Sequence, residues 1–195
     1  AHHGELAGGG PEAGAGGEGD GALAGRVSDG AGEMEEMVAV LAELAIDILA
    51  RQQPVASDLR LVVGALRMSA SLERMADLSQ HIAQLARYRY PESAIPRGLK
   101  KTFARMGALD VEMAHKIVEL LRTQEAGVID EVRNLDDDLD ELHAKVFEKV
   151  LSDKLASDPT GVVDATLASR YHERFGDHAV SVAKQMQFFL SGSID

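Results

Sequence analysis

Two segments of this chain, 100 positions apart, carry the same charged motif. Residues 73–77 read Glu-Arg-Met-Ala-Asp, and residues 173–177 read Glu-Arg-Phe-Gly-Asp. In the same register, Ser69 aligns with Ser169 and Ala83 with Ala183. Self-similarity at a fixed period indicates a duplicated structural unit. We therefore expect the 195 residues to form two related halves.

The spacing of apolar residues predicts that both halves are helical. Leu, Val, Ile, Met and Ala recur at three- and four-residue steps, which is typical of amphipathic helices. Aromatic residues are only 4% of the chain, whereas strands favour aromatic and β-branched residues. Proline bars continuation after residue 53, and Asp158 precedes Pro159 as a predicted helix N-cap. Helices are predicted over residues 34–49, from 54 or 57 to 88, and over 103–121, 132–150 and 159–189.

The predicted fold class is all-α: two tandem three-helix bundles related by internal duplication. The first unit is assigned to residues 1–90 and the second to residues 97–190. Residues 1–32 hold 12 of the 19 glycines, and each glycine costs a helix about 1 kcal/mol relative to alanine. We predict a flexible or poorly folded segment where the opening helix of the first unit belongs; a helix held only by packing is the alternative.

Charge and cysteine content narrow the classes of partner. The formal net charge of −12 disfavours nucleic acid and anionic lipid, and favours metal cations and basic protein surfaces. The absence of cysteine excludes disulfides and thiolate metal sites. No apolar run approaches the roughly 18–20 residues that span a bilayer, and no signal peptide is recognised. We expect a cytoplasmic protein without direct membrane insertion.

Acidic pairs at four-residue spacing are the candidate metal ligands. The three pairs are Glu73/Asp77, Asp136/Asp140 and Glu173/Asp177. Partners four apart lie on one helix face, where like charges repel each other. Two such helices side by side would gather oxygen ligands for a hard or borderline cation. On the helical wheel, the Glu73/Asp77 and Glu173/Asp177 pairs lie opposite the apolar faces, and the Asp136/Asp140 pair flanks the apolar stripe of its helix. This arrangement predicts a site on the outside of the bundle. A solvated acidic face without metal is the alternative.

The sequence contains few motifs that would indicate an enzyme. A core di-iron oxidase needs two Glu-x-x-His motifs, and only Glu112 with His115 supplies one. Nucleophile and nucleotide-loop motifs are missing. A basic cluster surrounds the middle connection, which predicts either a solvated surface or a docking or phosphate-attracting patch. Its residues are Arg87, Arg89, Arg97, Lys100, Lys101 and Arg105.

Four segments together resemble the PhoU-type phosphate-uptake regulators, in the style of the actinobacterial PhoY-like branch. They are residues 52–60 (QQPVASDLR), 72–78 (LERMADL), 136–143 (DDDLDELH) and 171–179 (YHERFGDHA). The resemblance implies two tandem three-helix bundles with surface-exposed multinuclear iron or zinc clusters. It assigns Asp136, Asp140, Glu173 and Asp177 to the second-half site, and Glu35, Glu73 and Asp77 to the first. One acid of the first site is replaced here by Ala31.

The function that the resemblance implies is regulation without catalysis. PhoU-like proteins restrain phosphate uptake and phosphate-responsive signalling by contact with the ATPase of the phosphate ABC transporter and with the phosphate sensor histidine kinase. A homodimer is compatible with this expectation. Two alternatives stay open: an intracellular metal-binding helical bundle unconnected to phosphate, and a metal-free helical scaffold.

Overall fold

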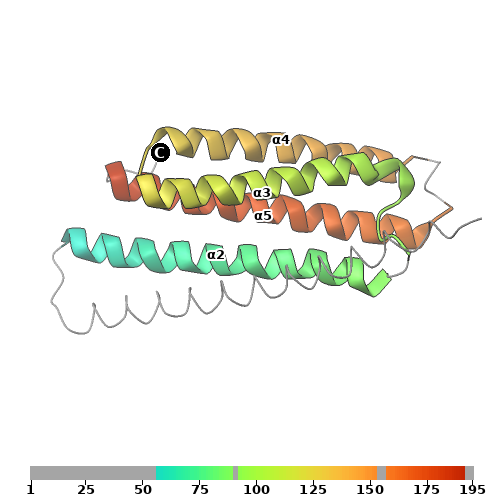
Figure 1. Ribbon diagram of the computed structural model, residues 1–195, viewed down its shortest axis with the longest axis horizontal. Helices are drawn as coiled ribbons and strands as arrows, with labels where there is room; N and C mark the ends of the chain where they lie inside the picture. The colour runs from blue at the N-terminus through green and yellow to red at the C-terminus, as the bar shows by residue number, and fades with distance from the viewer. Residues whose placement is uncertain (1–55, 90–91, 153–156, 192–195) are drawn as a thin grey trace, which may run out of the picture.

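The computed structural model describes residues 56–89, 92–152 and 157–191, and these are almost entirely helical (Figure 1). The long helices are α2 (Ala56–Arg89), α3 (Lys100–Thr123), α4 (Gly127–Val150) and α5 (Pro159–Ser191), and a 3-10 turn, η1 (Arg97–Leu99), precedes α3. None of the described residues forms a strand, so the all-α prediction is confirmed. The predictions for residues 1–32, for helix 34–49 and for Glu35 lie outside the described residues.

Local sequence signals set the helix ends. Gln124 takes a left-handed conformation (φ 57°) after α3, and its N–H donates to the carbonyl of Leu120 at 2.9 Å. A residue in this conformation commonly ends a helix, and it is usually glycine, whereas here it is a glutamine. The Asp158 carboxylate accepts from the N–H of Gly161 at 2.9 Å, which confirms the predicted N-cap of α5.

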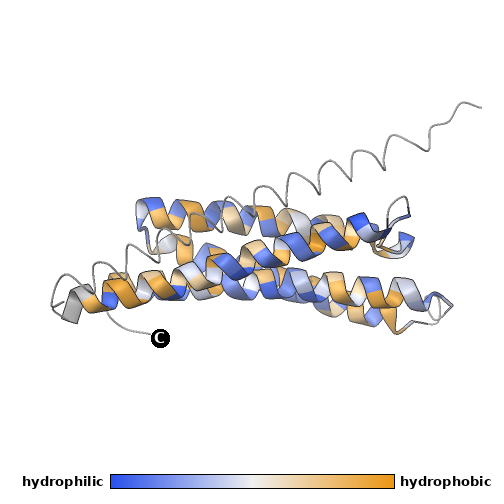
Figure 2. Ribbon diagram, turned by 90° about the horizontal axis from the view of Figure 1, so that it is seen from below, coloured by the Kyte–Doolittle hydropathy of each residue, from blue (hydrophilic) through white to orange (hydrophobic). Residues whose placement is uncertain are grey.

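Helices α3, α4 and α5 form an antiparallel three-helix bundle with an aliphatic core. Leu99, Met106, Leu109, Met113 and Leu139 are fully buried in it. Figure 2 shows hydrophobic and hydrophilic residues mixed along each described helix, as the amphipathic pattern requires. The predicted second unit therefore has all three of its helices, while α2 is the described part of the first.

Helices α2 and α5 run antiparallel and pack along their length (Figure 1). Some equivalent positions are buried in both helices: Ser69 and Ser169 are buried, as are Met75 and Phe175. An ion pair closes one end of this interface, with Arg89 Nε donating to Asp164 Oδ2 at 2.7 Å and Nη2 donating to Oδ1 at 3.0 Å. No described helix is long and apolar enough to cross a membrane.

Candidate functional site

Packing of α4 against α5 brings the predicted second-half carboxylates together. Asp136 and Asp140 come from α4, and Glu173 and Asp177 from α5. Burial raises the pKa of Asp136 to about 7, with further contributions from the charges of Asp140, Asp177, Asp137 and Glu173. The pKa of Asp140 is also raised, first by burial and then by Asp177 and Asp137. Four like charges thus share one small region.

Asp136 is the most constrained member of this group. Its Oδ1 atom is buried and has no hydrogen-bond partner. Gly176 makes room for that atom, because a Cβ placed on Gly176 would lie 2.4 Å from it. A buried, unpartnered carboxylate oxygen is costly, and a bound cation would compensate both it and the repulsion around it. The donor set therefore fits a hard or borderline cation.

The four carboxylates are not already arranged as a metal-coordination shell. Within the described ranges, no three His, Asp or Glu side chains already converge as ligands of a metal ion. Arg170 Nη1 donates to Glu173 Oε2 at 2.7 Å, so Glu173 would have to exchange this partner for a metal. Without a cation, the negative charges of these carboxylates repel each other, and this repulsion explains why their side chains do not converge.

The outward orientation predicted from the helical wheel holds in part. Asp140 and Asp177 are exposed, whereas Asp136 is half-buried and the Glu173 side chain is only 15% exposed. The site therefore lies at the edge of the α4–α5 interface and is less open than the wheel predicted.

The first-half set is represented by one helix. Glu73 is exposed on α2, and Asp77 accepts from Arg74 Nη1 at 3.0 Å. The third predicted ligand, Glu35, lies outside the described residues. The described part of the chain thus places only two of these carboxylates, one turn apart.

The sequence patterns did not identify a buried polar pair beside the site. His172 Nδ1 lies 2.5 Å from Asp110 Oδ2, and both residues are buried. Burial raises the pKa of Asp110, and the hydrogen bond from His172 opposes that rise. The pair ties α5 to α3, one residue before Glu173. The internal repeat contained a signal for this pair: His172 is polar, whereas the residue that aligns with it in the first copy is the apolar Leu72.

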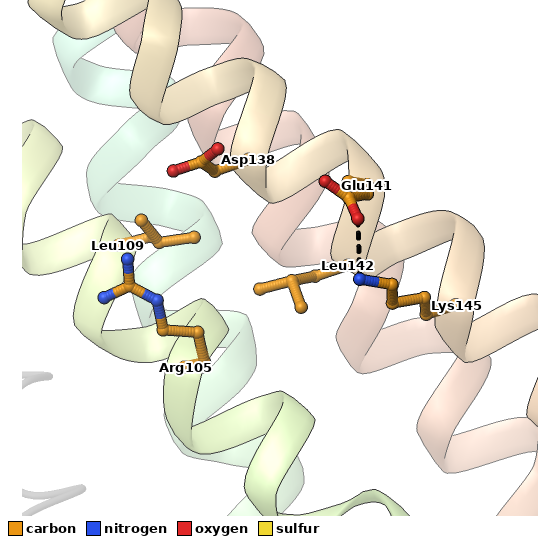
Figure 3. Close-up of a pocket in the computed structure, with 6 residues that line it drawn as sticks. All are labelled: Arg105, Leu109, Asp138, Glu141, Leu142 and Lys145. Carbon is orange, nitrogen blue, oxygen red and sulfur yellow. Dashed lines mark hydrogen bonds and ion pairs between the residues drawn. The ribbon is translucent and has the colours of Figure 1, made fainter.

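Two other features, the Glu-x-x-His motif and a surface pocket, do not belong to the carboxylate site. Glu112 and His115 are both exposed on α3, so this Glu-x-x-His motif cannot form a di-iron centre in the bundle core. A pocket between α3 and α4 is lined by two leucines and by charges of both signs (Figure 3). Its residues are Arg105, Leu109, Asp138, Glu141, Leu142 and Lys145. None of its carboxylates belongs to the predicted ligand set.

Comparison with known proteins gives one consistent result. The PhoU domain family matches residues 17–86 and 103–186. The phosphate-specific transport system accessory protein PhoU homolog 2 of Mycobacterium tuberculosis is 38% identical over 77% of this chain and 71% of its own length. Homolog 1 of Mycobacterium leprae is 37% identical over 77% and 68%. The crystal structure of PhoU from Pseudomonas aeruginosa superposes with a TM-score of 0.76 at 26% identity, covering 89% of this chain and 84% of that one. The two matched segments and this likeness agree with tandem helical bundles.

Proposed function

Because the chain belongs to the PhoU domain family, we propose that it is a cytoplasmic negative regulator of phosphate uptake and phosphate-responsive signalling. The observation that carries the proposal is the family match in both halves, together with relatives named as accessory proteins of phosphate-specific transport. Its action would be contact with the transporter ATPase and the phosphate sensor histidine kinase, without catalysis. Rigid, amphipathic helices that present an acidic surface suit binding to basic partner surfaces.

Affinity capture from phosphate-replete host cells tests the contact mechanism. Tagged full-length chain is cross-linked in the cells, recovered, and its partners are identified by mass spectrometry. We expect the phosphate transporter ATPase and the sensor kinase among the proteins enriched over a tag-only control. Absence of both from the enriched set would contradict the proposal.

A metal ion at the α4–α5 carboxylates is the second part of the proposal. Asp136, Asp140, Glu173 and Asp177 would hold iron or zinc, and the cation would supply charge neutralisation at a crowded anionic site. The buried, unpartnered Oδ1 of Asp136 supports this part. It also supports the rival function, an intracellular metal-binding bundle unconnected to phosphate.

Elemental analysis of protein purified from its host tests the metal. We expect iron or zinc in the wild type, and loss of most of it in Glu173→Ala/Asp177→Ala. Asp138→Ala/Glu141→Ala removes the same charge from exposed positions of α4 outside the ligand set and should retain the metal. A metal lost from the first variant in cells whose phosphate uptake stays normal would favour the rival function.

A further inference from the structure

One end of the helix bundle is basic although the chain as a whole carries a net charge of −12. This basic end consists of the last turn of α2, η1, the first turns of α3 and the last turn of α4, together with residues 92–96 and the start of α5 (Figure 1). Among the residues that the structure describes at this end, six cations are exposed, against three exposed carboxylates, Glu92, Glu148 and Asp158. The cations are Arg87, Arg97, Lys100, Lys101, Arg105 and Lys149.

Specific contacts hold the elements of this end together. Lys149 Nζ donates to the carbonyl of Gly98 at 3.0 Å, which joins α4 to η1. Arg89 is bound to Asp164, so it is not one of the free surface cations that the sequence cluster predicted. Arg105 lies exposed at the mouth of the α3–α4 pocket (Figure 3) and has no ion pair with any described residue.

Two exposed apolar side chains accompany these cations. Leu151, just after α4, is 84% exposed, and Tyr88, near the end of α2, is 81% exposed. They are the two most exposed large apolar side chains among the described residues. Leucine and tyrosine flanked by Lys and Arg are typical of surfaces that rest in the headgroup region of a bilayer.

We propose that the basic end is a docking surface for an anionic phospholipid membrane. Its cations come from four separate elements around the end of the bundle, which suits a flat, extended array of phosphates better than a single acidic peptide. The acidic remainder of the chain is repelled by the same membrane, so the molecule would stand end-on with Leu151 and Tyr88 among the headgroups. This proposal does not depend on the regulatory function, because the chain alone should bind.

Vesicle co-sedimentation with the full-length chain tests the proposal. Binding to phosphatidylcholine vesicles is compared with binding to vesicles that contain about 30% phosphatidylglycerol, at low and at physiological salt. We expect binding to the anionic vesicles only, and weaker binding as salt increases. Arg97→Ala/Lys100→Ala/Lys101→Ala should weaken partitioning roughly 100-fold, since each cation near the surface contributes a factor of about five. Leu151→Ser should weaken it several-fold.

The matched control removes the same charge from elsewhere. Arg67→Ala/Arg122→Ala/Lys184→Ala takes away three exposed cations outside the basic end and should leave vesicle binding within about fivefold of wild type. Circular dichroism confirms that all variants keep their helix content. Equal binding to both kinds of vesicle, no binding to either, or equal loss in both triple variants would overturn the proposal. Binding to soluble polyglutamate without binding to anionic vesicles would overturn it in favour of an acidic protein partner.

Discussion

Asp136 makes the fold of the metal-free chain sensitive to pH. Its pKa rises from an ordinary value of 3.8 to about 7 on folding. Between these values the folded state holds a proton that the unfolded state has lost, so stability falls as pH rises through that window. A cation at the site would favour the ionised form and oppose this loss.

Unfolding of chelator-treated protein between pH 4 and pH 8 checks this prediction. We expect Asp136→Asn to remove part of the decline and to be more stable than wild type near pH 8. Asp138→Asn, at the exposed neighbouring acid, should follow the wild-type profile. A wild type that gains stability over Asp136→Asn as pH rises would show that the carboxylate is not held in a repulsive environment.

The Asp110–His172 pair predicts a second effect on stability. His172→Leu restores the residue type found at Leu72 in the first copy, but it leaves both carboxylate oxygens of buried Asp110 without a partner, since Oδ1 already has none. We expect a cost of about 2–4 kcal/mol in urea unfolding. Asp110→Leu/His172→Leu should recover much of it, while His115→Leu on the exposed face of α3 should have little effect. Unchanged stability of His172→Leu would refute a structural role for the pair.

Gly176 sets how closely helix α5 approaches helix α4. A Cβ at Gly176 would lie 2.4 Å from Asp136 Oδ1 and 2.8 Å from Leu139 Cδ2, whereas a Cβ at Gly107 in α3 would meet nothing within 4 Å. Alanine gains about 1 kcal/mol of helix propensity at either position. Overpacking outweighs that gain only at Gly176.

Thermal or urea unfolding of Gly176→Ala and Gly107→Ala distinguishes the effect of helix propensity from the effect of overpacking. Gly176→Ala should destabilise the chain by about 1–3 kcal/mol, and Gly107→Ala should stabilise it by up to about 1 kcal/mol. The same direction of change in both variants would show that α4 and α5 are not in close contact at the carboxylate site.

The four described helices could be predicted from the sequence because their causes are local. Apolar periodicity, Pro159 and the Asp158 cap each act within a few residues, and the predicted limits agree with α2 to α5 within a few positions. The ties between helices have no such local signal. Arg89 is bound to Asp164, 75 residues away, although the sequence placed Arg89 in a surface cluster.

The two halves of the chain share a repeated motif but differ in the residues within and around it. The repeated Glu-Arg-x-x-Asp motif identified α2 and α5 as equivalent helices, and several of their equivalent positions are buried in both, such as Met75/Phe175 and Ala83/Ala183. It could not show that Gly176 opens space for Asp136, because Ala76 occupies that place in the first copy. The domain limits, the metal and the homodimer stay predictions.

We propose that this chain restrains phosphate uptake when phosphate is plentiful. The most direct test is the initial rate of labelled phosphate uptake in phosphate-replete host cells that lack the gene, with transcripts of the phosphate transporter measured alongside. We predict that both increase in the deletion strain and return to wild-type levels when the intact chain is supplied. Uptake and transcripts that do not change on deletion would contradict the claim.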